Sequence, residues 1–137
     1  MSATQRKVWS WVLVGVALAV ALAGCGLVED VQDARQVGND FMTALKEGDY
    51  EAAYAFFVVD LQQEVGSVAN LTSMIEDNQA QPSEWSFSSF NVTTKEDMDE
   101  ASLEGPVTYQ DGREGGVELE MVKLDDTWQL VSFNLTW

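Results

Sequence analysis

The sequence predicts an α+β domain in which N-terminal helices pack on a four-stranded antiparallel sheet, preceded by a hydrophobic signal or anchor helix. Between about residues 31 and 75, apolar residues recur at three- and four-residue spacing, which is typical of amphipathic helices. After Ser83 the pattern changes to an alternation rich in aromatic and β-branched residues, which indicates strands. Because the helices come first and the strands follow, we expect the helices to cover one face of the sheet.

The N-terminal segment has the three-part build of a secretory signal. Arg6 and Lys7 form a basic start, residues 12–23 form an uninterrupted apolar stretch, and small residues end it. The four residues Leu22-Ala23-Gly24-Cys25 resemble the lipobox of bacterial lipoproteins at every position.

This resemblance implies that residues 1–24 are a lipoprotein signal peptide and that Cys25 is the lipid attachment residue. Two or three acyl chains anchor a protein stably, because each buried methylene contributes about 0.8 kcal/mol and a single chain is marginal. The alternative is an uncleaved transmembrane anchor, since residues 8–28 are apolar and long enough to span a bilayer. Both interpretations attach the chain to a membrane of the cell envelope and place its domain on the extracytoplasmic side.

Composition limits the chemistry of the remaining chain, which we divide into a tether at residues 25–30 and one domain at residues 31–137. The sequence has no His and a single Cys, which excludes a Ser-His or Cys-His nucleophile, a zinc site and an intramolecular disulfide. Arg6 and Lys7 precede the tether, which leaves residues 25–137 with five basic residues against 23 acidic ones. Such a surface repels nucleic acid and anionic headgroups. We therefore expect no cofactor, no metal and no nucleic-acid partner.

Helix boundaries follow from capping residues. Gly48 supplies the left-handed conformation that ends the first helix, and Asp49 is placed to accept a backbone N–H at the start of the second. Asp60 with Gln63 three residues later resembles a capping box that restarts the helical pattern, and Gly66 interrupts it.

Four strands are expected, at about residues 85–94, 101–109, 115–124 and 128–137. In the first of them, Phe87 and Phe90 lie at positions of opposite parity. We predict a bulge near Ser88 and Ser89, because it would bring both rings to the same face of the sheet.

The hairpin between the last two strands allows two registers. A two-residue loop at Asp125 and Asp126 would set Leu119 opposite Ser132 and mix polar with apolar side chains on each face. A three-residue loop through Thr127 pairs like with like: Met121, Leu119 and Val117 face Val131, Phe133 and Leu135. We predict this second register, in which Glu118 and Glu120 share the opposite face with Ser132 and Asn134.

Residues 41–54 (Phe-Met-Thr-Ala-Leu-Lys-Glu-Gly-Asp-Tyr-Glu-Ala-Ala-Tyr) resemble the helix, Gly-Asp turn and helix that open nuclear transport factor 2-like domains. The terminal hairpin, with Trp128 after an acidic turn, is similar to that family too, so the resemblance covers about residues 30–137. It implies a cone in which a curved sheet wraps around helices. Small extracytoplasmic lipoproteins of unassigned function are the members that this chain resembles most.

Ketosteroid-isomerase-like members of that superfamily use a pocket acid or base together with a hydrogen-bonding tyrosine or aspartate. The candidates for such a role in this chain are Asp40, Tyr50, Tyr54, Asp60 and Tyr109. Nothing in the sequence pairs an identifiable base with an oxyanion donor, so we interpret them as caps, solvated carboxylates and core-edge tyrosines. We assign no catalytic residue.

The preferred hypothesis is a membrane-anchored, non-catalytic module that binds a protein partner or a small apolar ligand at the open end of the cone. Tyr54, Phe57, Phe90 and Trp128 are the residues expected to line its pocket. A hollow cone would favour a small ligand, and a filled core with an exposed apolar patch would favour a protein. The alternatives are an isomerase- or cyclase-type enzyme, which needs a buried carboxylate of raised pKa, and a structural or homodimerising envelope module on an uncleaved anchor.

Overall fold

The computed structural model describes residues 26–137. The lipobox Leu22–Cys25 and the rest of the predicted signal segment lie outside the described residues. Within residues 26–137, no helix combines the length and the apolar character that a membrane crossing requires. The domain discussed below is the compact unit Asp33–Trp137.

Four helices come first, as the periodicity predicts: α2 (Gly26–Glu47), α3 (Tyr50–Ala55), α4 (Val59–Val65) and α5 (Val68–Asp77). Gly48 ends α2 at a φ of 73°, and the Asp49 side chain accepts from the backbone N–H of Ala52 at the start of α3, so both capping predictions are confirmed. The capping box is wrong, because α4 begins at Val59 and Asp60 lies inside its first turn. Gly66, at a φ of 99°, ends α4.

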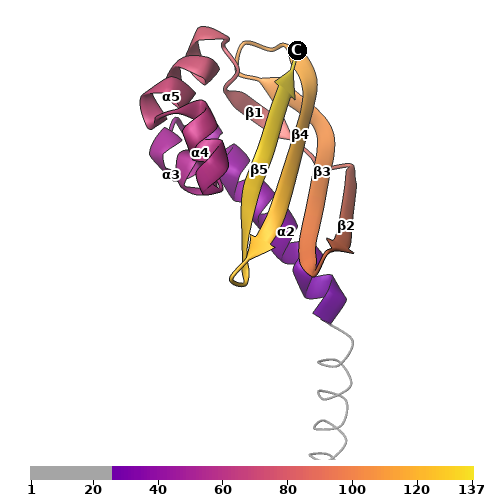
Figure 1. The fold of residues 1–137 in the computed structure, drawn as a ribbon. Coiled ribbons are helices and arrows are strands. Elements are labelled where there is room, and N and C mark those ends of the chain that lie inside the picture. Colours follow the sequence, from indigo (N-terminus) through magenta and orange to yellow (C-terminus); the bar gives the residue numbers. More distant parts are fainter. Residues whose placement is uncertain (1–25) are drawn as a thin grey trace, which may run out of the picture. The chain divides into compact units, whose positions relative to one another are not determined.

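Five strands follow: β1 (Pro82–Trp85), β2 (Ser89–Lys95), β3 (Met98–Tyr109), β4 (Glu114–Leu124) and β5 (Thr127–Thr136). They form one antiparallel sheet in the order β1-β3-β4-β5, and β2 pairs with β3 as well. Figure 1 shows the helices on one side of this sheet, with α4 and α5 next to β5. The sheet therefore ends at β5 on one side and at the short strands β1 and β2 on the other.

The predicted first strand is divided in two, which corrects the expected number of strands from four to five. Between the two parts, the chain crosses β3 so closely that a Cβ added at Gly105 would lie only 1.7 Å from the carbonyl oxygen of Ser86. The predicted bulge is wrong for the same reason: the backbone leaves the ladder between Trp85 and Ser89. Phe87 turns into the core, whereas Phe90 remains 44% exposed.

The hairpin between β4 and β5 combines the two registers that were considered. The turn holds two residues, since Leu124 pairs with Thr127 and both Asp125 and Asp126 have positive φ. A bulge then leaves Val131 unpaired, and beyond it Leu119 faces Phe133 and Val117 faces Leu135, as predicted. Met121 faces Leu130 instead of Val131. The bulge therefore restores the apolar face that the two-residue turn would have lost.

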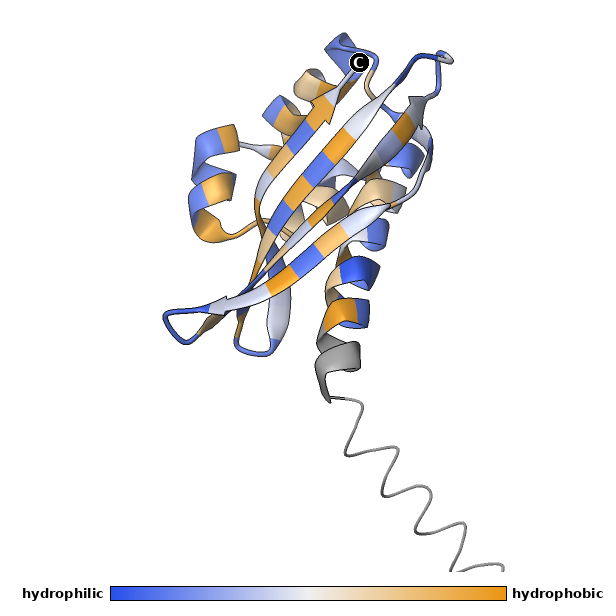
Figure 2. Ribbon diagram, turned by 90° about the vertical axis from the view of Figure 1, so that its right-hand side faces the viewer, coloured by the Kyte–Doolittle hydropathy of each residue, from blue (hydrophilic) through white to orange (hydrophobic). Residues whose placement is uncertain are grey.

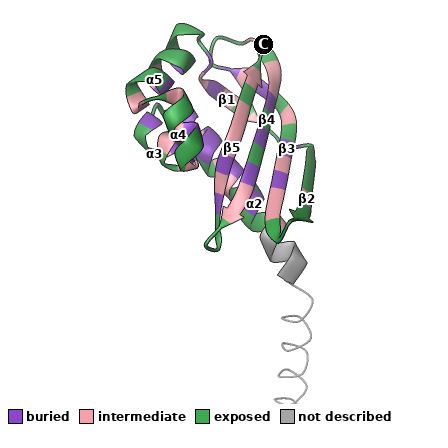
Figure 3. Cartoon of the chain, in the orientation of Figure 1, coloured by how far each residue is buried: buried purple, intermediate pink, exposed green. Residues whose placement is uncertain are grey.

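The core lies between α2 and the inner face of the sheet. Phe41, Met42 and Leu45 of α2 are completely buried, opposite the buried side chains of Leu103 and Leu119. Along β3 and β4, hydrophobic and hydrophilic residues alternate, and every second residue over long stretches is buried (Figures 2 and 3). One face of the sheet is therefore dry and filled, and the other faces solvent.

Candidate functional site

A groove runs along the free edge of the sheet, between β5 and the helices α4 and α5. It has a volume of about 540 Å³. Its lining consists of Leu61, Glu64 and Val65 of α4, Met74 and Ile75 of α5, Asn78, Ala80, the β5 segment at residues 131–135, and Trp137. Five consecutive residues of one strand line it, although successive side chains of a strand point to opposite faces. The groove therefore faces the edge of β5.

The local path of the chain explains why the groove exists. After α3, the backbone pairs briefly with β5: the N–H of Leu130 donates to Phe56 O (2.8 Å), and Leu130 O accepts from the N–H of Val58 (2.9 Å). This makes a single parallel bridge between Phe57 and Leu130. At Val59 the chain turns away into α4, so the pairing stops where the groove begins.

The floor of the groove is anchored in the core by stacked aromatic rings. Phe133 of β5 stacks on Phe57, with 5.3 Å between ring centroids and 14° between planes, and Phe41 meets Phe133 edge-on at 5.7 Å. The rim, in contrast, leaves apolar surface in solvent, because Met74 is 44% exposed and Trp137 is 56% exposed. The groove thus has a floor that packs on the core and an apolar rim that is exposed to solvent.

The charged residue in the lining of the groove is Glu64 of α4. The segment 59–78, which contains α4 and α5, carries Asp60, Glu64, Glu76 and Asp77 and no Lys or Arg. β5 itself contains no charged residue. An occupant of the groove would therefore meet negative charge on one side and an uncharged strand edge on the other.

Arg113 lies at one end of the groove, but its guanidinium is engaged. It donates to the carbonyl oxygens of Asn78 (2.8 Å) and Gln79 (2.9 Å), and it forms an ion pair with Asp111 at 2.6 Å. It also lies over the ring of Trp137, 5.4 Å from the centroid. Hydrogen bonds from Arg113, first from its backbone N–H, lower the pKa of the Asp111 carboxyl. Arg113 therefore ties the end of α5 to the turn between β3 and β4.

None of the four residues that the sequence proposed for a pocket lines this groove. The structure brings two of them together, since the rings of Tyr54 and Phe57 lie 5.7 Å apart, and the Tyr54 hydroxyl donates to Gln62 O. Phe57 and Trp128 are buried in the core, whereas Phe90 is exposed beneath the guanidinium of Arg35. The indole N–H of Trp128 has no hydrogen-bond partner within residues 26–137. Aromatic residues in this sequence therefore indicated the core. The signals that could have indicated the groove are the strand without charged residues and the apolar faces of α4 and α5.

The catalytic candidates are scattered. Asp40 and Asp60 are exposed, so neither is the buried carboxylate that the isomerase alternative needs. The Tyr109 hydroxyl is committed to a 2.7 Å hydrogen bond to Thr136 O, and burial raises its pKa. Burial also raises the pKa of Tyr50, with a further contribution from the Glu76 carboxylate, yet the Tyr50 hydroxyl makes no hydrogen bond of acceptable geometry. Within the described residues, no group of acidic side chains is arranged to hold a metal ion.

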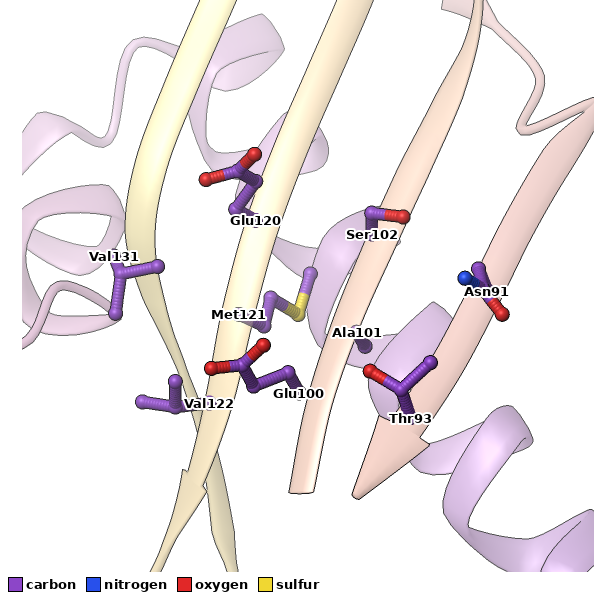
Figure 4. A pocket seen from close by; sticks show the side chains of 9 residues that line it. All are labelled: Asn91, Thr93, Glu100, Ala101, Ser102, Glu120, Met121, Val122 and Val131. Carbon is purple, nitrogen blue, oxygen red and sulfur yellow. The ribbon is translucent and has the colours of Figure 1, made fainter. Parts of the chain in front are cut away.

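The outer face of the sheet carries a second, smaller depression of about 200 Å³ (Figure 4). Glu100 and Glu120, together with Thr93, Asn91 and Ser102 from neighbouring strands, line it. On the same sheet, Glu104 pairs directly with Glu118 across β3 and β4, which places like charges opposite each other. Two copies pairing through this face would bring carboxylates against carboxylates.

Solved structures of other proteins share this arrangement. An NTF-2 like protein of unknown function from Shewanella oneidensis MR-1 is similar with a TM-score of 0.56 at 14% identity, covering 77% of this chain and 98% of that chain. An NTF2-like protein with a cystatin-like fold from Novosphingobium aromaticivorans gives a TM-score of 0.52 at 17% identity and covers 86% of each chain. Such identities concern the fold alone, and they confirm the NTF2-like fold that residues 41–54 indicated.

No curated protein matches the chain. Residues 28–136 match the family described as "Domain of unknown function (DUF4864)", and the chain therefore belongs to that family.

Proposed function

We propose that this protein is a non-catalytic binding module, held at the extracytoplasmic side of a membrane through Cys25, and that it binds a protein partner in the groove beside β5. The observation that carries the proposal is the contrast between two surfaces. The inner face of the sheet is filled by the side chains of α2, whereas the edge of β5 opens on a groove with exposed apolar residues. A filled core with an exposed apolar rim favours a protein over a small enclosed ligand.

The alternatives have less support. An isomerase-type site needs a carboxylate whose pKa is raised by burial, and no carboxyl among the described residues is buried. A homodimer through the outer face of the sheet would oppose Glu104 and Glu118 of one copy to carboxylates of the other. Binding at the groove requires neither arrangement.

The anchor rests on the lipobox resemblance and on the charge of the domain. Residues 25–137, with 23 acidic residues against five basic ones, are repelled by anionic headgroups, so a covalent lipid would be needed to hold them at a membrane. We expect the protein extracted from membranes to have the mass of residues 25–137 plus acyl chains. We expect Cys25→Ser to abolish the lipid and keep the unprocessed mass. A wild-type chain with the unmodified mass of 137 residues would contradict lipidation.

Binding at the groove is tested by site-specific photo-crosslinking in the cells that encode the protein. A benzophenone amino acid replaces Met74 on the rim of the groove or, as the control, Glu118 on the outer face of the sheet. We expect a discrete crosslinked protein from position 74 and none from position 118. Equal crosslinking at both positions, or none at position 74, would refute a partner at the groove.

A further inference from the structure

The two edges of the sheet differ in how they are protected against pairing. Exposed strand edges are templates for another strand, and proteins commonly blunt them with proline, charge or short length. β1 is four residues long and contains Pro82 and Glu84, and β2 ends at Lys95. β5 spans ten residues without a proline or a charged residue. The edge beside the groove is therefore the one left open to pairing.

Among the described residues, the edge of the β5 backbone that faces away from β4 is paired at Leu130. Leu130 exchanges two hydrogen bonds with the segment at Phe56 and Val58, and this segment runs parallel to β5. Continued for two more residues, it would pair with β5 beyond Leu130, but it turns into α4 at Val59. From residue 132 to residue 135, β5 pairs with β4 on one side, and residues 131–135 face the groove on the other. The groove thus lies where a further strand, paired with β5, would lie.

We propose that the groove binds an extended, basic segment of a partner protein, which adds a strand to the edge of β5 opposite α4 and α5. This inference rests on the proposed function and specifies its partner. Backbone hydrogen bonds to residues 131–135 supply the register, and alternate apolar side chains of the partner pack on Phe133, Val65 and Met74. At about 3.3 Å per residue, this edge pairs with a segment of about five or six residues.

Charge selects a basic segment over a second copy of this chain. Glu64 is the charged residue in the lining of the groove, the segment 59–78 that contains α4 and α5 has no basic residue, and residues 25–137 carry 23 acidic residues against five basic ones. A partner strand that alternates apolar residues with Lys or Arg would pack its apolar side chains on Phe133, Val65 and Met74, while Glu64 and the net negative charge of the domain attract its basic side chains. A second copy would bring another domain of strong negative charge to the same groove, which opposes its own docking.

The test uses the full chain in mild detergent and a fluorescent, end-capped hexapeptide, Lys-Val-Lys-Val-Lys-Val, with Glu-Val-Glu-Val-Glu-Val as its acidic twin. Fluorescence anisotropy measures binding to the wild type and to two matched pairs of variants. Met74→Lys changes the groove, and its control Val59→Lys changes an apolar residue that is 64% exposed outside the lining. Glu64→Lys changes the charged residue of the lining, and its control Glu118→Lys changes the outer face of the sheet. Circular dichroism checks that each variant is folded.

We expect the basic peptide to bind and the acidic twin not to bind. Met74→Lys and Glu64→Lys should weaken binding about tenfold, whereas their controls should change it less than about threefold. Hydrogen exchange should become slower at residues 131–135 and remain unchanged in the 100–109 segment of β3.

Three results would overturn the inference: no binding at about 1 mM peptide, equal losses in each variant and its control, or binding without slower exchange in β5. Equal losses would mean that the peptide is attracted by net charge alone. If position 74 still crosslinks a partner in cells, the proposed function survives such a failure, and only the strand-addition mode and the basic partner are lost.

Discussion

Replacing Gly38 by alanine tests how tightly α2 packs on the sheet. Gly38 lies within α2, where alanine would ordinarily stabilise the helix by about 1 kcal/mol. In this position, however, a Cβ would lie 2.5 Å from Leu103 Cδ1 and 3.3 Å from both Met121 Cε and Phe87 Cε2. All three neighbours are buried in the core, so none can move without displacing others. Overpacking of this kind costs about 1–3 kcal/mol.

We expect the steric cost to exceed the gain in helix propensity, so that Gly38→Ala lowers the free energy of unfolding by about 1–2 kcal/mol. Urea unfolding of the full chain, followed by far-ultraviolet circular dichroism, measures this change. Shortening the clashing side chain with Leu103→Val should relieve the clash. In that background, Gly38→Ala should cost less than about 0.5 kcal/mol, which gives a coupling free energy above about 0.5 kcal/mol. Additive effects of the two substitutions, or a stabilising Gly38→Ala in the wild type, would refute this account of the packing.

Three further predictions concern the tyrosines, Asp111 and the β5 bulge. Tyr50→Phe removes a hydroxyl without a hydrogen bond and should leave the urea midpoint at pH 7 unchanged or higher. Tyr109→Phe should lower the free energy of unfolding by about 1 kcal/mol, because it removes the hydrogen bond to Thr136 O. A larger loss of stability in Tyr50→Phe than in Tyr109→Phe would contradict these hydrogen-bonding roles. Because the folded-state pKa of both tyrosines is raised, the stability that each neutral hydroxyl contributes is complete below pH 10 and is lost as the pH rises through the folded pKa, so Tyr50→Phe should unfold at higher pH than the wild type in alkaline titrations. The folded-state pKa of Asp111 is lowered, so its contribution to stability is present above its unfolded pKa near 3.8 and is lost as the pH falls through the folded pKa. The difference in unfolding free energy between the wild type and Asp111→Asn should therefore shrink below pH 3.8. A difference that does not depend on pH would contradict the role of Arg113. Deleting Val131 removes the extra residue of the bulge and lets Ser132, Phe133 and Leu135 keep their partners on β4, so the variant should still unfold cooperatively in urea; a loss of cooperative unfolding would show that the bulge does not account for this register.

Local sequence signals predicted the order and the ends of most elements. The left-handed conformation of Gly48 and the cap at Asp49 depend on only a few neighbouring residues, because both involve adjacent backbone groups. The alternation along β3 and β4 likewise predicted which side chains face the core. The capping box at Asp60 failed because the chain first pairs with β5 at Phe57, and this tertiary contact sets where α4 begins.

The pocket residues were chosen from aromatic content, and that choice could not locate the groove. Phe57 and Trp128 bury large apolar surfaces and are drawn into the core, so they stabilise the fold without lining the groove. The groove depends on the neighbouring helices α4 and α5 meeting β5, a strand far from them in sequence, at one edge of the sheet. A pattern of period two or 3.6 shows which face of an element is apolar, but not which neighbour leaves that face uncovered.

The sequence by itself therefore determined the α+β order of this protein, the inward-facing residues of its strands and its acidic charge. Only the tertiary structure decided that the first strand divides where the chain crosses Gly105, that a bulge at Val131 corrects the last hairpin, and that α4 leaves the edge of β5 open. The physical reason is the range of the forces involved. Caps and periodicity act over a few residues, whereas close backbone crossings and sheet edges arise from segments that the chain brings together only on folding.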